Sequence, residues 1–173
     1  WGRFKKDYPP AYSNISLLAV DKNGSIFAGI EGEGLFRSND KGESWKELEN
    51  GLTNKRILAI IFDSKLMIYL GTSNGIFRGI DKDGGKFENI TGDLKNTIIQ
   101  SIAIDKDDNI YAGTDGGGVF IKNGDAGWED INFGLKNKRV LSLFSDKRGS
   151  IYAGTHDGLF VVSQGSSEWK DIS

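Results

Sequence analysis

The chain has 173 residues, which suits one domain of ordinary size and is too short for two large ones. Its 22 Lys and Arg residues nearly balance 24 Asp and Glu residues, and a net charge of −2 disfavours binding to nucleic acid or to an anionic membrane surface. Because it has no cysteine, one histidine and no apolar run of the roughly 18 residues that span a membrane, we expect no disulfide, metal, cofactor or membrane insertion.

Four segments of the sequence resemble one another at intervals of about 42 residues. Each is anchored by a glycine, and the four are Gly29, Gly71, Gly113 and Gly154. An isoleucine and an aromatic residue stand three and two positions before each glycine, and a phenylalanine stands six or seven positions after it. Eight positions before it there is always an aspartate: Asp21, Asp63, Asp105 and Asp146. A period of this length is typical of the blades of a β-propeller.

Each repeat is predicted to form four short strands separated by turns. In the second repeat, residues 57–62 are almost wholly apolar, whereas 67–71 and 76–79 are mixed. The fourth strand is aromatic and charged, as at 45–48 and 169–172. Because polarity rises from the first strand to the fourth, we expect the first at the centre of the ring and the fourth outside. No segment shows the apolar period of a helix.

The sequence therefore predicts an all-β fold, a β-propeller with four antiparallel four-stranded blades. The predicted blades cover residues 15–50, 57–91, 98–133 and 140–173. Residues 1–14 are interpreted as the outer strand of a preceding blade, at Trp1–Lys6, and a crossover. Tyr8–Tyr12 within it is expected to be a stiff linker, with an aromatic platform for sugar stacking as the alternative.

The ends of the chain bear on ring closure. The last repeat has an outer strand of its own, at 169–172. If the four blades closed into a ring, this strand and the outer strand expected at Trp1–Lys6 would compete for one position. We therefore expect part of a larger propeller, or a homodimer that completes an eight-bladed ring.

The connections carry residues that suit tight turns. The aspartate after each first strand is expected to cap backbone N–H groups. The acidic run 105–109 is expected to be such a turn, since it lacks the glycine and the glutamate of an EF-hand loop. The crossovers between blades repeat a leucine, expected to plug the gap between blades, and an asparagine, expected to hydrogen-bond the crossover. These residues are Leu52, Leu94, Leu135, Asn54, Asn96 and Asn137.

One segment carries a longer motif. Residues 38–45 match S-x-D-x-G-x-x-W through Ser38, Asp40, Gly42 and Trp45. This motif resembles the Asp-box of the BNR-repeat propellers, which occur in sialidases, sortilin-type receptors, xyloglucan hydrolases and photosystem II assembly factor-like proteins. The G-T-x-x-G-[LIV]-F boxes resemble the two-component-regulator propeller repeat. The resemblance implies that these four residues have a structural role, and that the protein is secreted, periplasmic or on the cell surface.

Propeller topology places the loop between the second and third strands of each blade on one rim with the crossovers. The polar residues expected on this rim are Glu31, Glu33, Asn74, Asp115, His156 and Asp157, with Lys55, Arg56, Lys95, Lys138 and Arg139 nearby. Carboxylates, an amide and cations together suit a polar ligand such as a glycan or a peptide. The alternative is that these loop tips are simply charged and solvated.

Enzymatic activity is not expected. Glu31 or Glu33 with Asp115 or Asp157 would meet the crude requirement of a glycosidase for two carboxylates. A sialidase would also need a cluster of arginines, and here the arginines occupy unlike positions in the repeats. Arg37 and Arg78 directly follow the repeat phenylalanine and are expected to point outward. His156 beside Asp157 could serve as a general base.

The position of His156 is taken by Ser73 and Asp115 in other repeats, which indicates a loop residue rather than a catalytic one. The sequence therefore predicts a non-catalytic module that recognises or scaffolds an extracytoplasmic protein or polysaccharide at the rim. The alternatives are a fragment of a carbohydrate-active propeller hydrolase and the sensor region of a two-component-type signalling protein.

Overall fold

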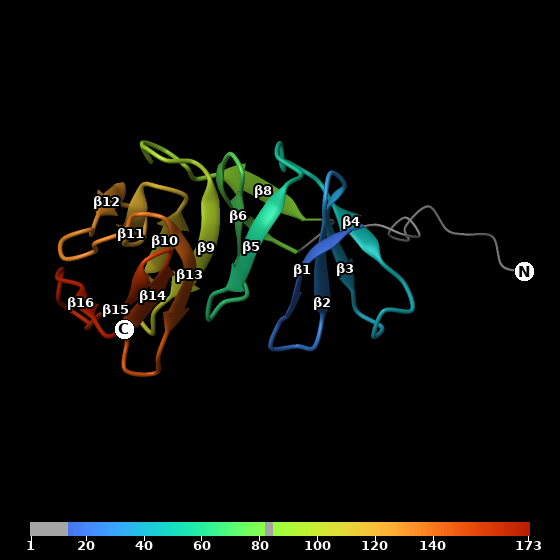
Figure 1. Ribbon diagram of the computed structural model, residues 1–173. Coiled ribbons are helices and arrows are strands. Elements are labelled where there is room, and N and C mark those ends of the chain that lie inside the picture. The colour runs from blue at the N-terminus through green and yellow to red at the C-terminus, as the bar shows by residue number, and fades with distance from the viewer. Residues whose placement is uncertain (1–13, 82–84) are drawn as a thin grey trace, which may run out of the picture.

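The computed structural model describes residues 14–81 and 85–173, and these residues form four antiparallel sheets of four strands each (Figure 1). Strands follow one another across each sheet in chain order, and the described residues contain no helix. The predicted all-β fold and its four-stranded blades are confirmed. The strand expected at Trp1–Lys6 and the linker expected at Tyr8–Tyr12 lie outside the described residues.

The sixteen strands divide evenly among the blades. The first blade consists of β1 (Ile15–Val20), β2 (Ile26–Ile30), β3 (Gly34–Ser38) and β4 (Lys46–Leu48). The second consists of β5 (Ile57–Phe62), β6 (Ile68–Thr72), β7 (Gly75–Ile80) and β8 (Lys86–Asn89). The third consists of β9 (Ile99–Ile104), β10 (Ile110–Thr114), β11 (Gly118–Lys122) and β12 (Trp128–Asp130). The fourth consists of β13 (Val140–Ser145), β14 (Ile151–Thr155), β15 (Gly158–Val162) and β16 (Lys170–Asp171).

The blades pack face to face in chain order. We call the side of a blade that meets the following blade its leading face, and the opposite side its trailing face. Side chains alternate between these faces along each strand. Leu17 and Ala19 of β1 pack from the leading face of the first blade into the same apolar cluster as Ile60 and Phe62 from the trailing face of the second.

Three apolar clusters of this kind fill the three interfaces between blades. Each contains the phenylalanine of the third strand of the following blade, namely Phe77, Phe120 or Phe160. Each also contains the crossover leucine, and Leu52, Leu94 and Leu135 are only 6–7% exposed. The predicted role of these leucines as plugs between blades is thereby confirmed.

Hydrogen bonds also cross the interfaces. The Ser101 hydroxyl on the leading face of the third blade accepts a hydrogen bond from the Leu143 N–H on the trailing face of the fourth (2.9 Å). The indole N–H of the fourth-strand tryptophan donates to a carbonyl that follows the fourth strand of the preceding blade. These pairs are Trp128 with Ile90 (2.9 Å) and Trp169 with Ile131 (2.5 Å).

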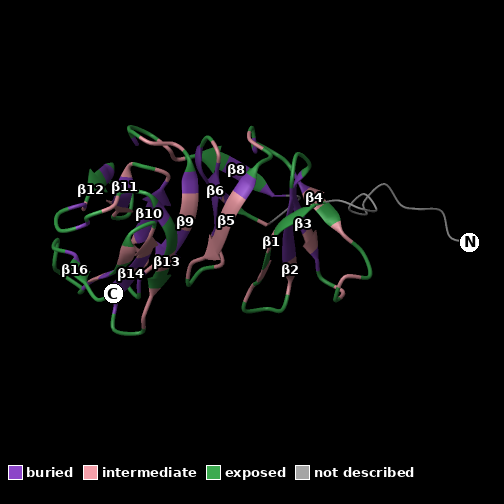
Figure 2. Cartoon of the chain, in the orientation of Figure 1, coloured by how far each residue is buried: buried purple, intermediate pink, exposed green. Residues whose placement is uncertain are grey.

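The first and last blades lie at opposite ends of the array, so the four blades do not close into a ring (Figure 1). Each end blade consequently exposes one face (Figure 2). On the trailing face of the first blade Ile15 is 55% exposed, while its equivalents Ile57, Ile99 and Val140 are at most 1% exposed. The array is therefore part of a larger propeller, as the sequence predicts.

The aspartate at the end of each first strand caps the turn that follows. In the third blade, Asp105 Oδ1 accepts from the N–H groups of Asp107 (2.9 Å) and Asn109 (3.0 Å). The same two bonds recur at Asp21, Asp63 and Asp146. The acidic run 105–109 is thus a turn, as predicted. The hydroxyl of Tyr111 donates to Asp105, and burial raises the pKa of that hydroxyl.

The 38–45 segment between β3 and β4 forms a tight turn closed by its own side chains. The Ser38 hydroxyl is buried, accepts from the Gly42 N–H (2.8 Å) and donates to Asp40 (2.7 Å). Asp40 accepts from both the N–H (2.8 Å) and the hydroxyl of Ser44. These bonds, first those from Ser44, lower the pKa of Asp40 to about 2. Asp40 therefore caps the turn between β3 and β4.

This turn makes the stability of the protein depend on pH in a defined window. Because the pKa of Asp40 is about 2 when folded against 3.8 ordinarily, its stabilisation is complete above 3.8 and is lost as the pH falls towards 2. We expect wild type to be more stable than Asp40→Asn at neutral pH, and the difference to shrink through that window. Urea unfolding at a series of pH values measures it.

The matched control is Asp93→Asn, since Asp93 lies exposed on a crossover. We expect this variant to match wild type at every pH. A difference between wild type and Asp40→Asn that stays constant down to pH 2 would contradict the role of the carboxylate.

Candidate functional site

The loop between the second and third strands of each blade is tied to the crossover that enters the same blade. In each case the N–H of the second residue after the repeat glycine donates to a crossover carbonyl. The four bonds run from Glu31 to Asn14 (2.9 Å), Ser73 to Arg56 (3.2 Å), Asp115 to Ile98 (3.1 Å) and His156 to Arg139 (3.2 Å). These loops and crossovers therefore share one edge of the array, which we call the rim, as the sequence predicts.

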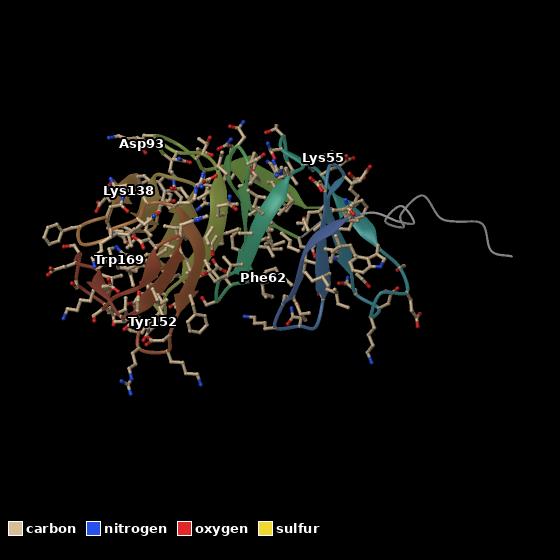
Figure 3. The ribbon with its side chains drawn as sticks, in the orientation of Figure 1. Lys55, Phe62, Asp93, Lys138, Tyr152 and Trp169 are labelled. Atoms are coloured by element: carbon tan, nitrogen blue, oxygen red, sulfur yellow. The ribbon has the colours of Figure 1, made fainter. Side chains whose placement is uncertain are left out.

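Figure 3 shows this edge through Lys55, Asp93 and Lys138, one residue from each crossover. Phe62 and Tyr152 lie toward the opposite edge (Figure 3). The crossover asparagines brace the rim: the side-chain oxygens of Asn54, Asn96 and Asn137 each accept from the N–H two residues later. Asn96 also donates to the Asp115 carbonyl (2.8 Å). The expected role of the asparagines is confirmed.

The structure places the predicted site residues on the rim in two different states. Glu31, Glu33, Asn74, His156 and Asp157 are exposed. Asp115 is partly buried, and its carboxylate accepts from Arg139 Nε (2.6 Å). Among the neighbouring cations, Lys55 donates to Glu47 (3.0 Å), and this bond raises the pKa of Lys55.

The two carboxylate groups that a glycosidase would need lie on separate blades. Glu31 and Glu33 belong to the first blade, whereas Asp115 and Asp157 belong to the third and fourth, and the second blade stands between them. Asp115 is moreover engaged by Arg139. Among residues 14–81 and 85–173, no group of three or more His, Cys, Asp and Glu residues could hold a metal ion.

Arg37 is positioned differently from its sequence-based prediction. It pairs with Phe27 in the β2–β3 register and therefore shares the leading face with it instead of pointing outward. Its guanidinium forms an ion pair with Asp81 of the second blade, and both side chains are 18% exposed. Burial lowers the pKa of Arg37. Arg78, one blade later, likewise reaches Asp125 of the following blade (3.7 Å).

A cleft of about 520 Å³ opens beside Arg37, between the first two blades and toward the edge opposite the rim. Phe27 and Phe62 form its apolar wall, with ring centroids 5.0 Å apart, and Asp21 and Lys65 come from the turns at its mouth. Sequence reasoning missed this cleft. The recurring arginine after the repeat phenylalanine was the available signal, but its face depends on strand register.

A second recurring group was also missed. In three blades, a polar side chain that follows the fourth strand accepts a hydrogen bond from the main-chain N–H of the first apolar residue in the third strand. The pairs are Thr91 with Ile76 (3.0 Å), Asn132 with Val119 (2.7 Å) and Ser173 with Leu159 (2.9 Å). Their signal in the sequence is their constant position 19 or 20 residues after the repeat glycine. They hold the outer strand near the rim.

Comparison with known proteins places the chain among propellers. A family model of the two component regulator propeller matches residues 93–116, which confirms the resemblance to that repeat. No significant match was found among the curated proteins. No helix of the described residues is long and apolar enough to cross a membrane.

Three solved structures illustrate the similarity of fold. The extracellular domain assigned to a hybrid two component system of B. thetaiotaomicron is 22% identical, with a TM-score of 0.74 over 100% of this chain and 23% of that one. An ancestral GH74 enzyme is 21% identical, with a TM-score of 0.77 over 93% and 24%. PorZ, a surface component of the type-IX secretion system of Porphyromonas gingivalis, is 20% identical, with a TM-score of 0.70 over 90% and 26%.

The chain spans about a quarter of the length of each of these three structures. At sequence identities of 20–22%, these matches show that the chain shares the propeller fold. Together with the four blades, this similarity identifies this chain as a β-propeller segment whose residues 93–116 match the model of the two component regulator propeller.

Proposed function

We propose that this chain is a non-catalytic recognition module that binds a polar ligand, a protein or a polysaccharide, at its rim and outside the cytoplasm. The observation that carries the proposal concerns the second residue after each repeat glycine, whose main-chain hydrogen bond is constant while its side chain varies. Its N–H makes the same hydrogen bond in all four blades, whereas its side chain is Glu31, Ser73, Asp115 or His156. A rigid frame that displays different polar groups is suited to recognition.

The location outside the cytoplasm rests on the kinds of protein that share the fold. One is described as an extracellular domain and another as a bacterial surface component. The alternative of a carbohydrate-active enzyme rests on the GH74 structure. Here the pairing of Asp115 with Arg139 engages one of the candidate carboxylates and favours binding over hydrolysis.

Binding at the rim can be tested with a glycan array and a peptide library as probes. For the strongest ligand found, the variant Glu31→Ala/Glu33→Ala/His156→Ala/Asp157→Ala is expected to weaken binding at least about tenfold, the loss of one or two polar contacts. The control is Lys147→Ala/Arg148→Ala, which changes the β13–β14 turn at the opposite edge. It should leave affinity unchanged, and equal losses would place the site elsewhere.

Hydrolysis is tested separately on xyloglucan and sialosides. We expect no product release. Turnover that Asp115→Ala or Asp157→Ala abolishes would overturn the non-catalytic assignment and favour the glycoside hydrolase.

A further inference from the structure

The first blade departs from the other three at the aromatic residue of its second strand. In those three blades this residue is a tyrosine, whose hydroxyl donates to Oδ2 of the aspartate that caps the first turn. The pairs are Tyr69 with Asp63 (3.4 Å), Tyr111 with Asp105 (3.1 Å) and Tyr152 with Asp146 (3.4 Å). In the first blade the residue is Phe27, which has no hydroxyl. Asp21 caps its turn through Oδ1 as its equivalents do, but no side chain of residues 14–81 and 85–173 donates to its Oδ2.

Asp21 lines the cleft beside Arg37, where a second position of the repeat also changes. Phe62 in the wall of this cleft corresponds to Val20, Ile104 and Ser145 in the other blades. Its ring is partly exposed and is tilted by 51° against that of Phe27. Figure 3 shows Phe62 toward the edge opposite the rim. This pair of blades therefore combines an aromatic wall with a carboxylate oxygen that has lost its usual donor.

The charged side chains that line the cleft cancel one another. Asp21 and Asp81 are negative, and Arg37 and Lys65 are positive, so the cleft gives no advantage to a charged ligand. Arg37 and Asp81 form an ion pair across the two blades, yet Arg37 Nε and Asp81 Oδ1 are buried and receive no hydrogen bond from the described residues. The cleft thus holds both an unmatched donor and unmatched acceptors. A hydroxyl group, which donates and accepts at once, suits such a site.

We propose that this cleft binds one sugar unit of a neutral saccharide, at a second site apart from the rim. A sugar hydroxyl would donate to Asp21, as a tyrosine hydroxyl does in the other blades, while the C–H groups of the sugar ring pack on Phe62. Asn23 and Asn39 line the cleft, are exposed and offer amides to further hydroxyls. The volume of about 520 Å³ lies in the usual range for small-molecule sites, about 300–1,000 Å³. This proposal does not rest on the ligand proposed for the rim.

The test is the binding of the methyl glycosides of glucose, galactose, mannose and xylose to the intact protein, measured by saturation-transfer NMR. We expect at least one probe to bind with a dissociation constant of about 1 mM or below. Phe27→Tyr restores the tyrosine of the other blades, and its hydroxyl would occupy the free oxygen of Asp21. This variant is expected to fold as wild type does, by circular dichroism, and to bind the same probe at least about tenfold more weakly.

Phe144→Tyr is the matched control, because it adds the same hydroxyl to a ring of the fourth blade that is 66% exposed. It should leave the affinity for the probe unchanged. Asn39→Ala removes an exposed amide of the cleft and is expected to weaken binding about threefold or more. The fourfold alanine variant of the rim should bind the probe as wild type does, which separates this proposal from the one for the rim.

Four results would overturn the proposal. They are the absence of binding of every probe at about 10 mM, a folded Phe27→Tyr variant that binds as tightly as wild type, equal weakening by Phe144→Tyr, and loss of binding in the rim variant. If Phe27→Tyr does not fold, Asn39→Ala decides in its place, and an unchanged affinity of that variant would then overturn the proposal.

Discussion

Substitution of Gly51 by alanine is expected to destabilise the protein by about 2–5 kcal/mol. Gly51 follows the first blade with φ at +83°, and a Cβ there would lie 2.1 Å from the carbonyl oxygen of Phe87 in the second blade. The contact is between main chains, because the Phe87 N–H also donates to the Asn50 carbonyl (2.8 Å). Because no side chain can rotate to relieve this contact, the main chain of the crossover would have to move away from the second blade. Urea unfolding measures the loss.

Gly92 supplies the matched control. It also has a positive φ, +53°, in a crossover, but the nearest atom to its Cβ would be 4.0 Å away. Gly92→Ala is therefore expected to cost only the conformational term of about 1–2 kcal/mol. If the two variants lost equal stability, the close approach to Phe87 would not be the cause.

Replacement of Asn132 by leucine is expected to cost about 2–5 kcal/mol, because a buried and a partly buried main-chain group lose their partners. Asn132 is 9% exposed, and its side chain accepts from the Val119 N–H (2.7 Å) and donates to the Gly117 carbonyl (3.0 Å). The side chain lies so close to Gly118 that a Cβ there would come within 1.9 Å of it. Leucine fits neither the bonds nor the space. Chemical unfolding again gives the difference.

Ser173→Ala removes the equivalent bond, to the Leu159 N–H (2.9 Å), at an exposed place. Water can replace the hydroxyl there, so a loss below about 0.5 kcal/mol is expected. A large loss at Ser173, or a negligible one at Asn132, would show that burial does not govern the value of this bond.

The fold was predictable because each repeat restates the same pattern. Gly29 and its three equivalents aligned the blades, and the apolar run of each first strand, with turn residues between the strands, identified the strands. The cap at Asp21 was predictable as well, since it is local: the carboxylate and the N–H groups it accepts from lie within four residues.

The parts that escaped prediction depend on contacts between distant residues. The face on which Arg37 lies is decided by its register with Phe27, and its partner Asp81 belongs to another blade. The cleft beside Arg37 is lined by residues of two blades that lie far apart in the sequence. The rim was predictable as a set of loops, because topology alone brings them together. The sequence did not indicate which rim carboxylate would form an ion pair, because the pairing of Asp115 with Arg139 joins successive blades.

The common plan of the three internal interfaces has a consequence for how such proteins change over generations. Duplication or deletion of one genetic unit, about 42 codons long, leaves every surviving junction with the surfaces it already had. A chain built in this way can thus gain or lose a whole unit in a single recombination event, while point changes at the loop tips diversify what each copy displays.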